Sequence, residues 1–307
     1  MRSTLVRTSV LIMTLICAGL KCNESTAQDF EIKPLKTSDH LHNVWQLSPR
    51  ILSGSEPMGD EAFRELAQLG VQTILSVDGL APDVKGAAKY GLRYVHIPFG
   101  YDGIPEESRL ALTRAARDIK GKIYVHCHHG KHRGPAGAAV LCRADDGRSR
   151  EAAAKILKAA GTSSDYAGLY RDVAGYTVPP ADAKLPPLQA VQSTKTAAQE
   201  MAELDRDFDA TKPLMTSLLK SPTEDVAAAR AATEKMTLIH EHFLEFERRL
   251  PAGADADLKS QVGEAKKTTE SMIEELKRTM INREVADGLW KKVESSCARC
   301  HAAHRNS

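Results

Sequence analysis

The chain has 307 residues, which is enough for two domains of ordinary size. Its 42 basic and 40 acidic side chains leave a formal net charge of +2, so the composition gives no support for a nucleic-acid-binding surface or a strongly acidic partner. Ala, Glu, Lys and Leu are common in the last third, which favours helices there.

The first residues have the three parts of a secretion signal. Arg2 and Arg7 supply positive charge, Val10–Leu20 is an apolar run, and Ser25-Thr26-Ala27 offers a small-residue cleavage site. We therefore expect a signal peptide over residues 1–27, a periplasmic or otherwise exported protein, and no membrane span in the mature chain.

Two other interpretations of this segment are open. A membrane anchor is disfavoured because eleven apolar residues are too few to cross a bilayer. A lipoprotein signal is the other alternative because Cys17 and Cys22 are present, although Lys21 directly precedes Cys22.

Residues 40–177 alternate between strand-like and helix-like patterns. Such alternation predicts an α/β domain with a mostly parallel sheet flanked by helices. The expected strands are 72–77, 92–98 and 122–126, and the expected helices are 60–69, 106–119, 135–144 and 150–160.

Residues 178–187 contain four prolines and predict a stiff, extended linker between separate modules. Beyond it, residues 188–307 show helical periodicity with short breaks. This pattern predicts an all-α antiparallel four-helix bundle. The expected helices are 188–219, 222–250, 255–280 and 283–305.

A cysteine-arginine loop lies between the expected strand 122–126 and the following helix. It reads His126-Cys127-His128-His129-Gly130-Lys131-His132-Arg133. The amides at a helix N-terminus can bind a phosphoryl group and lower the pKa of a thiol. Arg133 can pair two phosphoryl oxygens, and Gly130 lets the loop bend close to the ligand. Attack by the Cys127 thiolate would give a phosphocysteine, which water then hydrolyses.

Four residues of this loop match the H-C-x-x-G-x-x-R signature of the protein tyrosine phosphatase superfamily: His126, Cys127, Gly130 and Arg133. The loop is similar to that of small atypical dual-specificity phosphatases of plants and fungi. Ser53–Pro57 and Leu69–Ile74 also resemble the start of bacterial members, so the resemblance covers about residues 50–176. It implies phosphate monoester hydrolysis on a phosphorylated protein or a small phosphate ester.

The resemblance also implies a catalytic acid on a loop upstream of the nucleophile. Asp102 is the candidate, and Asp78 is the second choice. An alternative is that Asp102 only shapes a turn. The family usually has Ser or Thr after the arginine, where this chain has Gly134, so hydrolysis of the phosphocysteine could be slow or the domain could bind phosphate without turnover.

The four loop histidines are expected to act as spacers and added positive charge, and not as metal ligands. With them, the expected phosphate-binding loop comprises His126, His128, His129, Gly130, Lys131, His132 and Gly134.

A second cysteine motif, Cys297-Ala298-Arg299-Cys300-His301, lies close to the end of the sequence. C-x-x-C-H places two thiols where they can bind haem vinyl groups, with the histidine directed to the iron. A redox cysteine pair or part of a zinc site is the alternative, but no second cysteine pair is left to complete a zinc site, because Cys142 is expected to be a buried helical cysteine.

The position of this motif in a last helix resembles the cytochrome c-prime and c556 group. The resemblance covers residues 188–307 and implies one covalent haem c, with His301 as the proximal iron ligand. His304 stands where the group usually has an aromatic residue. Met201 is at the right depth of the first helix to be the distal ligand, whereas Met215 is too far along it. The alternative is that Met201 only packs the core.

Together the motifs predict an exported cysteine-dependent phosphatase coupled to a haem c domain for electron transfer or redox sensing, which implies a redox partner. The alternative is an electron-transfer or gas-binding cytochrome with a catalytically weak phosphate-binding front domain.

Overall fold

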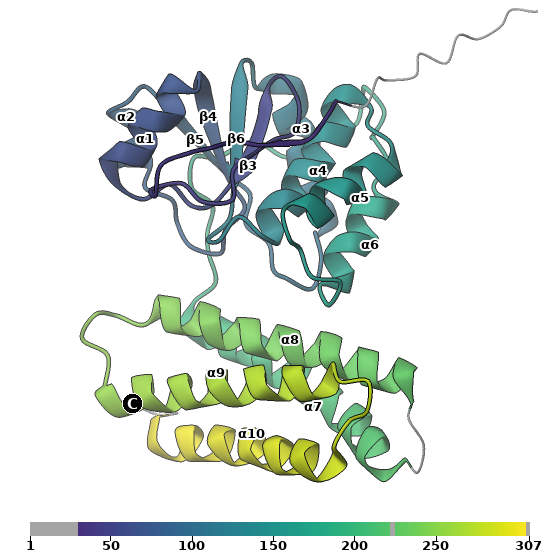
Figure 1. Ribbon diagram of the computed structural model, residues 1–307. Helices are drawn as coiled ribbons and strands as arrows, with labels where there is room; N and C mark the ends of the chain where they lie inside the picture. Colours follow the sequence, from purple (N-terminus) through teal and green to yellow (C-terminus); the bar gives the residue numbers. More distant parts are fainter. Residues whose placement is uncertain (1–29, 222–224, 305–307) are drawn as a thin grey trace, which may run out of the picture.

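The computed structural model describes residues 30–221 and 225–304. The expected signal peptide, residues 1–27, lies outside the described residues. The chain forms an α/β region followed by a helical region, and the two are in contact (Figure 1).

The α/β region is built on a six-stranded mixed sheet with the order β1-β2-β3-β6-β4-β5. Its strands are β1 Lys33–Pro34, β2 Trp45–Gln46, β3 Ile51–Gly54, β4 Val71–Ser76, β5 Arg93–His96 and β6 Lys122–His126. Strands β3, β6, β4 and β5 are parallel, and β1 and β2 add an antiparallel edge. The expected sheet with flanking helices is therefore present, and its first strand lies upstream of residue 40.

Helices cover both faces of the sheet (Figure 1). These are α1 Gly59–Gln68, α2 Val84–Ala88, α3 Glu106–Asp118, α4 Arg133–Asp146, α5 Arg150–Ala159 and α6 Ala167–Gly175. One core forms between the sheet and α1, around Phe63 and Ile74. The larger core forms with α3 to α6, around Val125 and Leu141. Strand β6 lies between β3 and β4 and is almost fully buried, so the residue that follows it is fixed on both sides.

The helical region contains α7 Ala197–Lys220, α8 Val226–Arg249, α9 Ala256–Leu276 and α10 Arg283–His304. Each helix packs on the next, and α10 also contacts α7. Their shared core includes Phe208, Met215, Met236, Phe243 and Trp290. Among residues 30–221 and 225–304, no helix combines the length and the apolar character that crossing a membrane requires.

Helix α7 begins at Ala197, nine residues later than the sequence pattern indicated. Thr196 and Gln199 form a reciprocal capping box, which satisfies backbone N–H groups at the start of the helix. The residues before it are held along the α/β region. Arg117 Nη2 donates to Pro179 O at 2.6 Å, and His96 N donates to Gln189 O at 2.9 Å. The segment that was expected to be a linker is therefore held along the α/β region.

Candidate active site

The Cys127 loop leaves the end of β6 and turns into α4. Gly130 has φ 68°, and a Cβ at this position would lie 2.3 Å from the backbone carbon of Gly54. Only glycine therefore fits this turn. Asn43 Nδ2 donates to Gly130 O at 2.9 Å and fixes the outside of the loop.

Cys127 lies at the bottom of this loop with only 3% of its surface exposed. Burial raises the pKa of the Cys127 thiol, while Arg133 and the backbone amides of Gly134 and His132 act in the opposite direction. The expectation of a lowered thiol pKa is thus wrong for this closed structure. The amides and the arginine are arranged as expected, but burial outweighs them.

Arg133 begins α4 and is 1% exposed. Its Nη2 donates to Asp78 Oδ2 at 3.0 Å, to Tyr101 Oη at 2.8 Å and to Glu245 Oε1 at 2.7 Å. The guanidinium carbon lies 4.1 Å from the centre of the Tyr101 ring. Its Nε is buried and has no partner among the described residues. A buried, unpaired guanidinium N–H is costly unless an acceptor binds there.

Asp78 and Asp102 have different environments. Asp78 is 2% exposed and accepts hydrogen bonds from Arg133 and from the amide of His128. Burial opposes its ionisation, but Arg133 and Arg248 hold its pKa well below the ordinary value, so Asp78 carries no proton to donate at neutral pH. Asp102 is exposed and lines the same cavity as Arg133. Of the two expected acids, Asp102 is therefore the one that is open to the cavity.

Three of the loop histidines, His126, His129 and His132, do not add the positive charge that was expected of them. Burial lowers the pKa of His126 to about 4 and that of His132 to about 4, and it also lowers the pKa of His129. His132 stacks on Tyr166 at 4.1 Å between ring centres. His128 Nδ1 pairs with Glu56 at 3.0 Å. These rings fill and support the loop.

The other two residues expected in the phosphate-binding loop are Lys131 and Gly134. Lys131 is exposed, and its carbonyl accepts a 2.5 Å hydrogen bond from Thr162 Oγ1. Gly134 is buried in the first turn of α4, where a Cβ would lie 3.1 Å from Cys127 N. The loop of the sequence motif is therefore one compact unit.

A cavity of about 420 Å³ lies between the α/β region and the helical region. Tyr101, Asp102 and Arg133 line one side of it, and Glu241 and Glu245 of α8 line the other. The sequence reasoning missed both glutamates. Their spacing of four residues places them on one helix face, but it gives no sign of what that face contacts.

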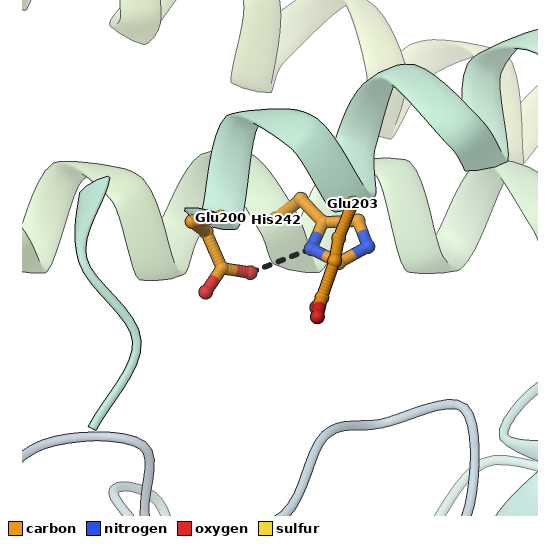
Figure 2. A group of neighbouring side chains, drawn as sticks. All are labelled: Glu200, Glu203 and His242. Atoms are coloured by element: carbon orange, nitrogen blue, oxygen red, sulfur yellow. Dashed lines mark hydrogen bonds and ion pairs between the residues drawn. The ribbon is translucent and has the colours of Figure 1, made fainter. Parts of the chain in front are cut away.

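Glu200, Glu203 and His242 also meet at this cavity, from α7 and α8 (Figure 2). His242 Nδ1 lies 2.6 Å from Glu200 Oε1, and its Nε2 lies 3.1 Å from Asp207 Oδ2. Burial opposes the charged ring, but these hydrogen bonds raise the pKa of His242 to about 9. In this structure the cluster is an ion-pair network between the two helices.

A second cavity, of about 180 Å³, lies inside the helical region next to the C-x-x-C-H motif. Cys297, Cys300 and His301 line it together with Met201. The rest of its lining includes Leu204, Phe208, Phe243, Val262 and Ala265. Both thiols are free, as are Cys127 and Cys142.

The lining holds the groups that haem c attachment needs, two free thiols and an imidazole, among apolar, aromatic and polar side chains. Met215 is fully buried in the core and does not line the cavity, whereas Met201 does. Cys142 is buried in α4, and burial raises its pKa to about 12, as suits an inert core cysteine.

No family model matches the chain, and no curated protein matches it. Solved structures are similar to part of it. TpbA from P. aeruginosa is 21% identical, with 47% of this chain and 90% of that chain covered and a TM-score of 0.40. A DUF442 protein from Shewanella putrefaciens CN-32 is 22% identical over 43% of this chain and 89% of that chain, with a TM-score of 0.37. Human DUSP28 is 21% identical over 46% of this chain and 93% of that chain, with a TM-score of 0.33.

Proposed function

We propose that this protein is an exported cysteine-dependent phosphatase that hydrolyses phosphate monoesters, joined to a four-helix haem c domain. The observation that carries the phosphatase assignment is the buried, unpartnered Nε of Arg133 beside the Cys127 loop. An anion with several acceptor oxygens would satisfy that N–H and the loop amides together. The substrate is a phosphorylated protein or a small phosphate ester.

The proposed reaction has two steps. The Cys127 thiolate attacks phosphorus, the P–O ester bond breaks, and the leaving oxygen takes a proton from Asp102. Water then attacks the phosphocysteine, loses a proton to the Asp102 carboxylate, and the S–P bond breaks to release phosphate and the thiolate. Arg133 holds two of the phosphoryl oxygens in both steps.

We further propose that Cys297 and Cys300 hold one haem c, with His301 as the proximal ligand and Met201 as the distal ligand. Support comes from the free thiols and from the cavity that they share with His301 and Met201. When bound, the haem would supply one-electron transfer to a redox partner or report redox state. Covalent haem attachment outside the cytoplasm agrees with the proposed export signal.

One preparation from a host that attaches haem c tests both halves. We expect p-nitrophenyl phosphate hydrolysis by the intact chain and its complete loss in Cys127→Ser. Cys142→Ala is the matched control, because Cys142 is equally buried but lies within α4, and it should keep the activity. Covalent haem should be present in all three proteins and absent from Cys297→Ala/Cys300→Ala.

The alternative, a cytochrome with a phosphate-binding but inactive front domain, gives a different result. It predicts that the intact chain binds inorganic phosphate without hydrolysing the ester. Equal hydrolysis by the intact chain and Cys127→Ser contradicts a cysteine nucleophile altogether.

A further inference from the structure

One face of α8 is docked on the Cys127 loop. Glu241, Glu245 and Arg248 are spaced by four and three residues, which places them on the same side of the helix. Glu241 Oε1 accepts a 2.5 Å hydrogen bond from Tyr166 Oη, and Arg248 Nη2 donates to Asp78 Oδ1 at 2.9 Å. Glu245 lies between them and accepts from Arg133 Nη2 at 2.7 Å. In Figure 1, α8 runs along the side of the helical region that faces the α/β region.

The docking is close. Arg249 Nη2 donates to the carbonyl of Gly79 at 3.1 Å. A Cβ at Gly79 would lie 2.7 Å from Arg249 Nη2 and 3.1 Å from Glu245 Oε2. Helix α8 therefore approaches bare backbone at the position directly after Asp78. Lys277 also pairs with Asp165 at 2.5 Å, so the C-terminal end of α9 contributes to the same contact.

The Glu245 carboxylate is paired with Arg133, the residue that we propose binds phosphate. Its side chain is 6% exposed. Burial opposes its charge, but Arg133 lowers its pKa, so the carboxylate is ionised. Asp78 already neutralises Arg133 from within the α/β region at 3.0 Å, so the stability of that region does not require a second carboxylate.

We propose that α8 is a built-in inhibitor of the Cys127 site, in which the Glu245 carboxylate takes the place of a substrate oxygen on Arg133. This inference rests on the proposed phosphatase function. Substrate reaches Cys127 only when α8 moves away. A phosphate monoester carries close to two negative charges, so it competes well against the single charge of Glu245.

Glu245→Gln tests the contact, because the amide keeps the shape and removes the charge. Glu247→Gln is the matched control on the same helix: Glu247 faces α9, where Lys266 Nζ lies 2.5 Å from its Oε2. Two measurements are made on full-length holoprotein: the rate of iodoacetamide alkylation of Cys127, followed by peptide mass spectrometry, and the hydrolysis of p-nitrophenyl phosphate. Cys142 is the internal standard for global unfolding, because it is fully buried.

In Glu245→Gln we expect both rates, the alkylation of Cys127 by iodoacetamide and the hydrolysis of the ester, to be at least roughly tenfold higher than in the wild type. In Glu247→Gln both rates should match those of the wild type. Unchanged alkylation and hydrolysis in Glu245→Gln would overturn the inhibitor. So would slower hydrolysis with unchanged alkylation, which would make Glu245 part of the catalytic site. A third outcome is faster alkylation in Glu245→Gln with no ester hydrolysis by any of the proteins. That outcome would support α8 as the cover of Cys127 and would refute the phosphatase function.

Discussion

Gly134 is the residue at which this chain departs from the family that its loop resembles. A Cβ there would lie 3.1 Å from Cys127 N and 3.4 Å from Cys127 Sγ. A serine or threonine therefore does not fit unless the loop shifts by a few tenths of an ångström. The glycine lets α4 start directly against Cys127, and it leaves the proposed reaction without the hydroxyl that would help expel the thiolate.

Gly134→Ala should destabilise the protein by about 1–3 kcal/mol, because the added methyl group overpacks the buried loop. Urea unfolding measures this change. Gly175→Ala is the control: Gly175 ends α6, and a Cβ added there would meet no atom within 4 Å, so its effect should stay below about 1 kcal/mol. Equal stability of the two variants would mean that the loop has more room than these distances indicate.

At the level of single residues, the sequence predicts which side chains form the loop, but not their partners from distant elements or their pKa values. The order of residues in the loop predicts roles for Cys127 and Arg133, and a loop position predicts one for Asp102; the structure places Asp102 and Arg133 at one cavity. Glu245 could not be found this way, because it meets Arg133 from 112 residues away. The lowered pKa values of His126, His129 and His132 could not be predicted from the sequence either, because they depend on burial in the fold.

The pairing of α7 with α8 depends on a buried charge network. His242 on α8 is held between Glu200 and Asp207 of α7, with its pKa raised to about 9 from 6.5. Because the pKa of His242 is higher in the folded chain than in the unfolded chain, its charge stabilises the fold fully at a pH below the unfolded-state pKa. This contribution is lost as the pH rises through the folded-state pKa. The shift is worth at most about 3 kcal/mol.

Wild-type protein should therefore lose more stability than His242→Gln when the pH is raised from about 6 to about 10. Denaturant unfolding of both proteins across this range measures the difference, which should shrink towards alkaline pH. A constant difference at all pH values would show that His242 contributes by packing and not by its charge.

Secondary structure was predicted best where a long periodic pattern coincided with a clear boundary. The strand expected at 122–126 is β6, and the helix expected at 106–119 is α3, which ends one residue earlier. Strands β1 and β2 have two residues each, too few to produce a pattern. The start of α7 was misplaced because apolar periodicity upstream outweighed the capping box at Thr196.

Helices α7 and α8 form a common wall between the two candidate sites. On α8, Glu245 lies at Arg133, while Phe243 lines the cavity that contains Cys297, Cys300 and His301. Residues of α7 and α8 line both cavities, so each of these helices borders both candidate sites. A change in packing at the cavity beside Cys297 would therefore act on α8, the helix that we propose covers Cys127.

Phe243→Leu should speed the alkylation of Cys127 severalfold, because the lost ring volume loosens α8 from the inside. Phe208→Leu is the matched control: Phe208 lines the same cavity, but it lies on α7, which does not carry Glu245. The same alkylation assay measures both variants. If both variants accelerate the alkylation of Cys127 equally, the helical region as a whole has loosened. If Phe243→Leu does not accelerate it, packing at the cavity beside Cys297 has no effect on the Cys127 site.

The segment that joins the two regions sets how far α8 can move. Its backbone is held as far as Gln192, whose amide donates to His96 Nδ1 at 3.2 Å, and α7 begins at Ala197. Residues 193–196 can span at most about 14 Å when extended. A tether this short keeps the Glu245 carboxylate at an effective concentration in the millimolar range or above near Arg133. In the proposed cycle, Glu245 would rebind Arg133 intramolecularly once phosphate leaves, without the help of a partner protein.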